Sequence, residues 1–314
     1  MTISARCRFT DGAEYLLEPE TGESLIDAAL RHGIPVKHQC LSGSCLSCLC
    51  ISETGGLAMK PNVATSLLSS DIAAGERLLC SANLEAEDCL TFDYPSTAQA
   101  PRKVHTFINV VERVCDDVVR LEVELADGEH IDFSPGQYVN ITVPGTESSR
   151  SYSMSSTPNE LPTLEFYIRL LDSGVMSDYL RTQAKPDDVL TLEGPYGRFC
   201  ADLSRATPML FIAGGTGLSP VLSLIRQARN RVGRKPPMLL SFGCATKSRL
   251  FAEETLTLLS SWTPSLDIRI HVEDGSSSEF ASGNPVTGLT TNDVHTGTEA
   301  FICGPPGMVQ AAHN

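Results

Sequence analysis

Four cysteines in this chain have a spacing that suits electron-transfer chemistry. Cys40, Cys45 and Cys48 lie in the run QCLSGSCLSC, and Cys80 follows much later in RLLCSA. Three thiols close together and a fourth far along the chain match the plant-type ligand spacing of a [2Fe–2S] cluster. Gly43 lets the backbone of the run curl close to the inorganic sulfides. We therefore expect these four cysteines to hold a one-electron carrier.

Other uses of these cysteines fit the spacing less well. A structural zinc site usually shows two closely spaced ligand pairs, whereas Cys80 stands alone. A redox pair at Cys45 and Cys48 would leave Cys40 without a role, and a Rieske centre needs histidine ligands. Cys50 stays open, because its position favours a buried structural thiol without excluding a ligand. We interpret five others as small core residues: Cys7, Cys89, Cys115, Cys200 and Cys244.

A second group of residues could hold a flavin. Arg150, Tyr152 and Ser153 lie in the run RSYS, directly after a strand pattern and a turn. A flavin needs a planar wall for its ring, a hydrogen-bond donor near its reactive nitrogen and a cation for its phosphate. Tyr152 can supply the wall, Ser153 the donor and Arg150 the cation.

Two further segments strengthen the flavin hypothesis. Gly174, Met176 and Ser177 open an expected helix, whose free N–H groups could bind a pyrophosphate. Arg169 precedes this helix on an expected strand, and the turn GPYGRF follows at 194–199. The three pieces in this order predict an FAD site, with Ser153 expected to act in catalysis.

The last third of the chain has the pattern of a nucleotide-binding sheet. A glycine-rich turn follows the apolar strand MLFIA, and Cys303 ends the last expected strand. Ligands of open parallel sheets bind at the carboxyl ends of the strands, which places Cys303 beside a nicotinamide as a second catalytic candidate. The turn fits the G-x-G-x-x-G pattern poorly. The expected coenzyme-binding residues are Gly214, Gly215, Thr216, Gly217, Cys303 and Gly304.

Pattern changes along the chain predict several domains. Residues 1–95 show short strands, a helix capped by Ser24 and the cysteine run; residues 96–102 are expected to be a linker. Residues 103–203 show regular short strands separated by turns, which predicts an antiparallel barrel. Residues 204–314 alternate strands with helices, which predicts an α/β domain with a parallel sheet.

Composition excludes several functions. The net charge of −14 disfavours nucleic acid, and the first hundred residues hold 13 acidic but only 6 basic residues. The N-terminus lacks the apolar core of a signal peptide, and no apolar stretch is long enough to cross a bilayer. We expect a cytoplasmic protein, monomeric and without membrane or nucleic-acid partners.

The motifs together resemble the ferredoxin–NADP reductase superfamily with an N-terminal ferredoxin domain. The segment GQYVNITVPGTESSRSYS is especially similar to the reductase components of benzoate- and anthranilate-type aromatic-ring dioxygenases. The resemblance implies a β-grasp ferredoxin domain, a six-stranded FAD barrel and an α/β nucleotide domain. It implies that electrons pass from NADH through FAD and the cluster to a terminal Rieske oxygenase.

The resemblance also implies roles for single residues. Arg150, Tyr152 and Ser153 would hold FAD, with Ser153 near flavin N5, while Gly174 and Ser177 would hold its pyrophosphate. Gly215, Thr216 and Cys303 would shape the nicotinamide site.

Two alternatives to this function stay open from the sequence. The reductase of a diiron monooxygenase has the same domain order, and a redox-sensing protein could carry the same cluster.

Two departures from the family pattern affect the expectations. The chain ends at Asn314, where relatives continue, so we expect the C-terminal domain to be incomplete. Lys247, Ser248 and Arg249 occupy a loop where basic residues suit the 2′-phosphate of NADPH. The family favours NADH, and we expect NADH to be preferred with measurable use of NADPH.

Overall fold

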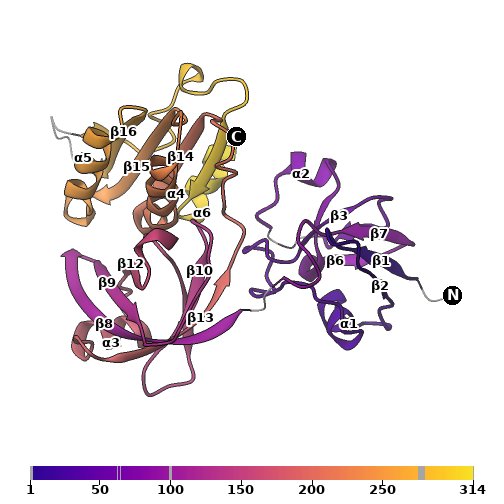
Figure 1. Ribbon diagram of the computed structural model, residues 1–314. Helices are drawn as coiled ribbons and strands as arrows, with labels where there is room; N and C mark the ends of the chain where they lie inside the picture. Colours follow the sequence, from indigo (N-terminus) through magenta and orange to yellow (C-terminus); the bar gives the residue numbers. More distant parts are fainter. Residues whose placement is uncertain (1–2, 62, 64, 99–100, 275–279, 314) are drawn as a thin grey trace. The chain divides into compact units, whose positions relative to one another are not determined.

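The computed structural model describes residues 3–61, 63, 65–98, 101–274 and 280–313. The chain forms two compact units (Figure 1). The first comprises residues 1–101 and 196–198, and the second comprises residues 102–195 and 199–314. Residues 99 and 100 of the predicted linker lie outside the described residues. Within the described part of the chain, no helix has the length and apolar character needed to cross a membrane.

The first unit is an α+β fold around one five-stranded sheet of order β2-β1-β7-β3-β5. β1 lies between β2, with which it pairs antiparallel, and β7, with which it pairs parallel. The chain between β2 and β7 therefore crosses from one side of β1 to the other. Its strands are β1 (Ala5–Arg8), β2 (Glu14–Leu17), β3 (Leu49–Ser52), β5 (Glu76–Leu78) and β7 (Asp88–Thr91), with β4 (Leu57–Met59) and β6 (Ala82–Leu84) paired separately.

Helix α1 (Leu25–Arg31) begins and ends close to where the sequence predicts. The Ser24 side chain accepts a hydrogen bond from the Asp27 N–H at 3.1 Å, which satisfies one of the free donors of the first turn. Gly33, just beyond the helix, has a φ of 64°, the left-handed conformation that ends many helices. A shorter helix, α2 (Ser69–Ala73), precedes β5.

The second unit begins with an antiparallel six-stranded sheet of order β11-β10-β13-β8-β9-β12. Just after β11, the Ser155 N–H donates to the Glu165 carbonyl on β12 at 2.8 Å, so the two edges of the sheet meet as in a barrel. α3 (Val175–Thr182) contributes Met176, Tyr179 and Leu180 to the barrel core. The strands are β8 (Arg102–Cys115), β9 (Val118–Leu125), β10 (Tyr138–Thr142), β11 (Ser149–Ser153), β12 (Thr163–Arg169) and β13 (Val189–Tyr196).

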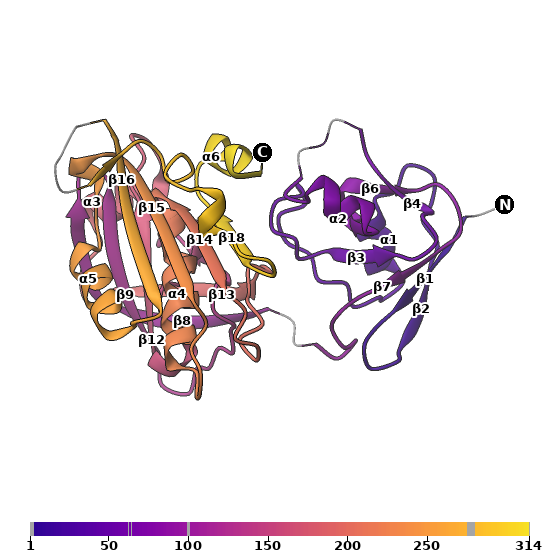
Figure 2. The ribbon, with the colours of Figure 1, turned by 90° about the horizontal axis from the view of Figure 1, so that it is seen from above.

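The second unit continues as an α/β fold with a parallel sheet of order β17-β16-β15-β14-β18 (Figure 2). β14 is buried at every residue, as expected for a central parallel strand. The strands are β14 (Met209–Gly214), β15 (Met238–Thr246), β16 (Leu266–Asp274), β17 (Ala281–Ser282) and β18 (Glu299–Cys303), and the helices are α4 (Leu218–Asn230), α5 (Glu253–Trp262) and α6 (Pro306–His313). These three architectures confirm the predicted fold class.

α4 joins the parallel sheet to the barrel. The Ser223 hydroxyl donates to the Ser156 carbonyl at 2.6 Å, and Arg226 donates to the Glu165 carboxylate at 2.9 Å. Tyr167 of the barrel packs against Phe251 of the α/β fold, with the rings tilted by 37° and their centroids 5.1 Å apart. These polar bonds and this shared apolar core fix the carboxyl ends of the parallel strands beside β11 and β12.

Candidate functional site

The cysteine run forms a tight loop between α1 and β3. Leu41, Gly43 and Leu46 all have positive φ, with values of 54°, 78° and 57°. Left-handed conformations are unfavourable for leucine, so the loop is held in its shape by its surroundings. The N–H groups of Ser42 and Cys45 both donate to the Cys40 sulfur, each at 3.4 Å.

Two contacts relate the four predicted ligands in pairs. In the first pair, the backbone of Cys45 bonds the sulfur of Cys40, and in the second the thiols of Cys48 and Cys80 are hydrogen-bonded to each other. The Gly43 N–H points to the Cys80 sulfur and links the loop to the distant cysteine. Each iron of a [2Fe–2S] cluster takes two of the four thiolates, so two pairs suit this cluster.

Two of the thiols are acidified. Burial raises the pKa of Cys40, but hydrogen bonds from Ser44, Ser42 and Cys45 outweigh burial and lower that pKa to about 6. The hydrogen bond from Cys48 lowers the pKa of Cys80 and raises that of Cys48. A thiolate is the form that ligates iron, so Cys40 and Cys80 are prepared for ligation. Among the described side chains, no three of His, Cys, Asp or Glu form a site for a single metal ion.

Cys50 lies two residues beyond the loop, on β3, and points into the core. Its side chain is 2% exposed, and its thiol donates to the Arg77 carbonyl at 3.7 Å. Burial raises its pKa. This is the environment of a structural thiol.

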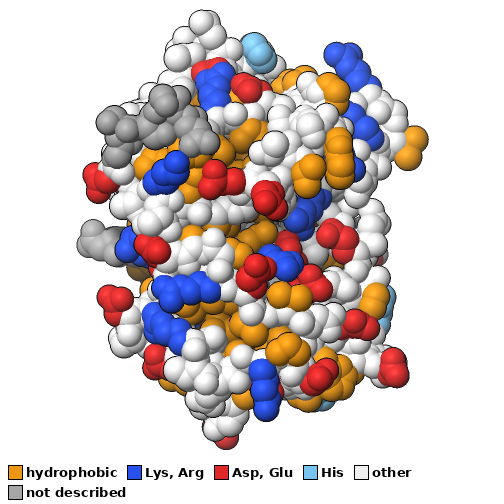
Figure 3. All heavy atoms as spheres, turned by 90° about the vertical axis from the view of Figure 1, so that its left-hand side faces the viewer, with side chains coloured by type: hydrophobic (Ala, Val, Ile, Leu, Met, Phe, Trp, Pro, Cys, Tyr) orange, Lys and Arg blue, Asp and Glu red, His pale blue; other side chains and the backbone are white. Residues whose placement is uncertain are grey.

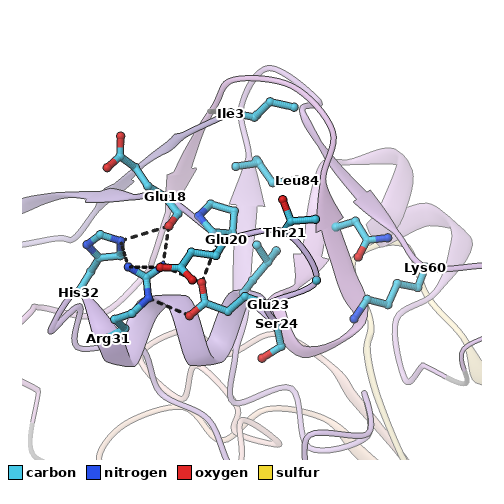
Figure 4. A pocket seen from close by; sticks show the side chains of 14 residues that line it. Ile3, Glu18, Glu20, Thr21, Glu23, Ser24, Arg31, His32, Lys60 and Leu84 are labelled. Atoms are coloured by element: carbon cyan, nitrogen blue, oxygen red, sulfur yellow. Dashed lines mark hydrogen bonds and ion pairs between the residues drawn. The ribbon is translucent and has the colours of Figure 1, made fainter. Parts of the chain in front are cut away.

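A broad hollow of about 1130 Å³ lies elsewhere on the first unit, and no cysteine lines it (Figure 4). Arg31 at the end of α1 donates to the Glu23 carboxylate at 2.9 and 2.6 Å and to the Glu18 carbonyl at 2.8 Å. The bonds from Arg31 to the carboxylate lower the pKa of Glu23 to about 2. The ion pair ties α1 to the segment before it, which is a structural role.

The second unit has a cleft of about 790 Å³ between the barrel and the carboxyl ends of the parallel strands. Segments far apart in the sequence line it. They include β11 and β12 from the barrel, the turn after β14, the end of β15 and the segment after β18. The cleft brings together the following predicted site residues: Tyr152, Ser153, Arg169, Gly214, Gly215, Thr216, Gly217, Cys303 and Gly304.

Tyr152 and Ser153 present the two groups expected of a flavin site. Both line the cleft from β11. Tyr152 is partly buried against the barrel core, and burial raises its pKa to about 12, so its phenol stays neutral. Arg150 is exposed on the same strand, does not line the cleft and donates to the Ser149 carbonyl at 2.7 Å.

The three predicted pyrophosphate residues lie around the start of α3. Gly174 precedes the helix with a φ of 154°. The Ser177 hydroxyl is buried and accepts from the Leu171 N–H at 3.0 Å, while Met176 is buried in the barrel core. Both side chains therefore have structural partners, and only backbone N–H groups of this segment are suited to bind a phosphate.

The glycines after β14 have two different uses. A Cβ on Gly217 would lie 2.2 Å from the Cys303 carbonyl oxygen, and one on Gly214 would lie 2.8 Å from the Met308 sulfur. These glycines let the two segments pack against each other. Gly215 instead has a φ of 54° and free space beside it, so close approach of a ligand is suited to this position.

Cys303 lies at the end of β18, in the cleft, as the sequence predicts. Burial raises its pKa to about 11. The thiol is therefore protonated at neutral pH and is a poor nucleophile. It suits a small neutral wall beside a bound ring.

Two carboxylates that line the cleft were not predicted from the sequence: Asp117 between β8 and β9, and Glu273 near the end of β16. Asp117 accepts from Arg169 at 3.1 Å and pairs with Arg249 at 3.5 Å. No motif marks Asp117, because its partners lie far along the chain. The position of Glu273 at the carboxyl end of a parallel strand is a signal that could have identified it.

The charges on the face of the second unit seen in Figure 3 are mixed. Lys and Arg side chains alternate with Asp and Glu, and hydrophobic side chains show between them. Nucleic-acid binding depends on a concentrated basic surface, and the described side chains of this face do not form one.

Fold and site together define an oxidoreductase with an iron–sulfur part, a flavin part and a nicotinamide part. Three family models match the chain in this order. The 2Fe-2S iron-sulfur cluster binding domain matches residues 9–85, the oxidoreductase FAD-binding domain residues 106–200 and the oxidoreductase NAD-binding domain residues 211–314. These matches confirm the predicted cofactors.

Relatives match the chain over nearly its whole length. The anthranilate 1,2-dioxygenase electron transfer component of Acinetobacter baylyi is 30% identical, over 99% of this chain and 92% of its own. The toluate 1,2-dioxygenase electron transfer component of Pseudomonas putida is 30% identical, over 99% and 93%. The propane 2-monooxygenase reductase component of Mycolicibacterium goodii is 30% identical, over 92% and 86%. The chain belongs to this family of ferredoxin–NAD(P) reductase-type electron transfer components.

Solved structures share the fold. The cytochrome P450 reductase of Amycolatopsis has a TM-score of 0.71 at 25% identity, covering 99% of this chain and 93% of its own. The ferredoxin reductase in carbazole 1,9a-dioxygenase has a TM-score of 0.65 at 22% identity, with the same coverage.

Proposed function

We propose that this protein takes electrons from NADH and passes them through FAD and a [2Fe–2S] cluster to the terminal oxygenase of an aromatic-ring dioxygenase. The observation that carries the proposal is the order of three cofactor domains on one chain, with paired cysteines in one unit and a lined cleft in the other. When bound, the flavin accepts a hydride and releases its electrons singly, which suits a one-electron cluster. Carrying both groups on one chain keeps donor and acceptor at a high effective concentration.

In the first unit, Cys40, Cys45, Cys48 and Cys80 would be the cluster ligands. The contact of the Cys45 N–H with the Cys40 sulfur and the contact between the Cys48 and Cys80 thiols support this assignment. The backbone N–H groups of the loop would donate to sulfur and stabilise its negative charge.

In the second unit, Tyr152 would cover the flavin ring and Ser153 would donate a hydrogen bond near its reactive nitrogen. Arg150 would reach the phosphate from the exposed end of β11. The segment from Gly174 to Ser177 would bind the pyrophosphate through its backbone, and Arg169 would supply a nearby cation. Ser153 and the protonated thiol of Cys303 would orient the two rings for hydride transfer.

The coenzyme would bind where β14 and β18 end. Gly215 and Thr216 would contact its pyrophosphate, because Gly215 leaves open space beside the backbone. Gly214, Gly217 and Gly304 would hold the walls of the site together by close packing. Excluding water from this cleft would keep the hydride from being lost to solvent.

The proposal includes the domain boundaries from the sequence: 1–95, the linker 96–102, 103–203 and 204–314. It also includes a monomer in the cytoplasm. A partner oxygenase would then meet the chain in solution, without a membrane component.

The partner class has one serious competitor. The anthranilate and toluate relatives support a Rieske oxygenase, while the propane 2-monooxygenase relatives support a diiron hydroxylase. The dioxygenase relatives cover the larger share of this chain, so we favour the Rieske partner.

Reconstitution decides between the two partners. The purified holoprotein is mixed with NADH and either a benzoate-type Rieske oxygenase or a diiron hydroxylase, and hydroxylated product is measured per NADH consumed. We expect coupled product formation with the Rieske oxygenase and none above background with the hydroxylase. The Cys80→Ser variant serves as the control that lacks electron delivery. Coupled turnover with the hydroxylase alone would overturn the partner assignment.

A further inference from the structure

The carboxylate of Asp117 lies between two arginines of the cleft. One of its oxygens, Oδ2, accepts from the Arg169 guanidinium at 3.1 Å and lies 3.5 Å from the Arg249 Nε. The Asp117 side chain is 17% exposed, whereas the two arginines are 52% and 44% exposed. All three line the cleft. The carboxylate is thus the least solvent-screened member of the group.

Backbone bonds hold Arg249 beside this carboxylate. The Asp116 N–H donates to the Ser248 carbonyl at 3.1 Å, and the Cys115 thiol donates to the Arg249 carbonyl at 3.5 Å. The loop that carries Arg249 is therefore tied to the turn that carries Asp117 at two more points. Arg249 is therefore already paired with a carboxylate and is not an unpaired cation facing the coenzyme.

The charges that line the cleft balance. They are the cations Arg169 and Arg249 and the carboxylates Asp117 and Glu273. A 2′-phosphate adds about two negative charges at neutral pH. In a formally neutral cleft it meets no excess positive charge, whereas the ribose hydroxyl of NADH carries no charge.

The other basic residue of the loop is also engaged. The Lys247 ammonium lies over the Phe280 ring, 5.5 Å from its centre, and does not line the cleft. Arg249 is therefore the loop cation on which binding of a 2′-phosphate depends.

We propose that Asp117, a residue of the flavin barrel, determines coenzyme preference by occupying Arg249. This inference rests on the proposed function. Asp117 is a specificity-determining residue that acts through Arg249, and it makes the chain prefer NADH although its coenzyme loop is basic. Replacing the carboxylate by an amide removes one negative charge and frees Arg249 for the 2′-phosphate.

The test measures binding of 2′,5′-ADP and 5′-AMP, which differ only in the 2′-phosphate, to the holoprotein by isothermal titration calorimetry. In Asp117→Asn, the affinity for 2′,5′-ADP relative to 5′-AMP should rise about fivefold, the scale of one exposed ion pair. The ratio of kcat/KM for NADPH over NADH should rise by a similar factor. Adding Arg249→Ala to Asp117→Asn should remove the gain. The matched control is Asp116→Asn, which removes the same charge from the adjacent residue. It should leave the affinity ratio and the kcat/KM ratio within twofold of those of the unaltered protein.

A second variant tests the inference without altering Asp117. In Arg249→Ala alone, the affinity for 2′,5′-ADP should change less than twofold, because Arg249 is already occupied. A fall of about tenfold in that variant, a loss of about 1.4 kcal/mol, would show that Arg249 serves the phosphate freely and would overturn the inference. An unchanged ratio in Asp117→Asn would do the same. Failure of the unaltered protein to bind 5′-AMP at all would instead overturn the proposed function, and this inference with it.

Discussion

The cluster loop and the cleft are built in opposite ways. Three of the four cysteines lie within residues 40–48, and hydrogen bonds between neighbours in the sequence set their sulfurs. The cleft draws its lining from segments spread along the second unit, from Asp117 to Ala311. A site made of residues close together in the sequence can be recognised from their spacing. A site made of distant segments shows only short, separate motifs in the sequence.

The backbones of the two regions also differ. The loop holds Leu41 and Leu46 in left-handed conformations that leucine rarely adopts. The cleft depends on close approach, because the space beside Gly217 is filled by the backbone at Cys303. Strain within one loop and packing between distant segments are therefore the features that substitutions should disturb.

The largest expected effect is loss of the cluster. Serine in place of Cys40, Cys45, Cys48 or Cys80 removes a thiolate and should reduce iron content to near background while FAD is retained. Iron and flavin per chain are measured on each purified variant. The matched control is Cys50→Ser, two residues after Cys48, which should keep its iron. Iron retained in Cys48→Ser but lost in Cys50→Ser would refute the ligand set.

A smaller effect is expected where the segments of the cleft meet. In Gly217→Ala the new Cβ would lie 2.2 Å from the Cys303 carbonyl oxygen, and such overpacking costs about 1–3 kcal/mol. Denaturant unfolding of the second unit should show this loss, and the KM for NADH should rise.

Gly307→Ala is the control for the loss of stability. It lies within α6 with nothing within 4 Å of the new Cβ, so stability should stay level or rise by about 0.5 kcal/mol. Equal losses in the two variants would mean that close packing at Gly217 does not shape the cleft.

The smallest expected effect is a pH dependence in the first unit, away from the cysteines. Hydrogen bonds from Arg31 lower the pKa of Glu23 from 4.5 to about 2. A lowered pKa in the folded state stabilises the fold above pH 4.5, and this contribution is lost as the pH falls toward 2. Between pH 5 and pH 3, the unaltered protein should lose more stability than Glu23→Gln does.

Glu20→Gln provides the comparison for this pH test. Glu20 lies 3.9 Å from Arg31 and is 75% exposed. Its replacement should leave the pH dependence of thermal unfolding in place. If Glu20→Gln removed that dependence and Glu23→Gln did not, the wrong carboxylate would have been assigned.

The sequence predicted those structural features that depend on residues close together in the chain or on a repeating pattern of apolar residues. The Ser24 cap of α1 and the strand pattern of residues 118–125, which is β9, predicted structures that the fold shows. The roles of Gly214 and Gly217 were only partly predicted, because a glycine suits a ligand and a packed backbone equally well. Asp117 was not predicted, because its role depends on contacts with Arg169 and Arg249, which only the folded chain brings together.

Anaerobic titration of the purified protein with NADH, followed by visible spectroscopy, tests the central claim most directly. The account predicts that NADH bleaches both the flavin and the cluster, with uptake of two electrons by FAD and one by the cluster in each chain. In Cys80→Ser only the flavin should bleach. A flavin that stays oxidised under excess NADH, or a cluster that stays oxidised once the flavin is reduced, would contradict the account.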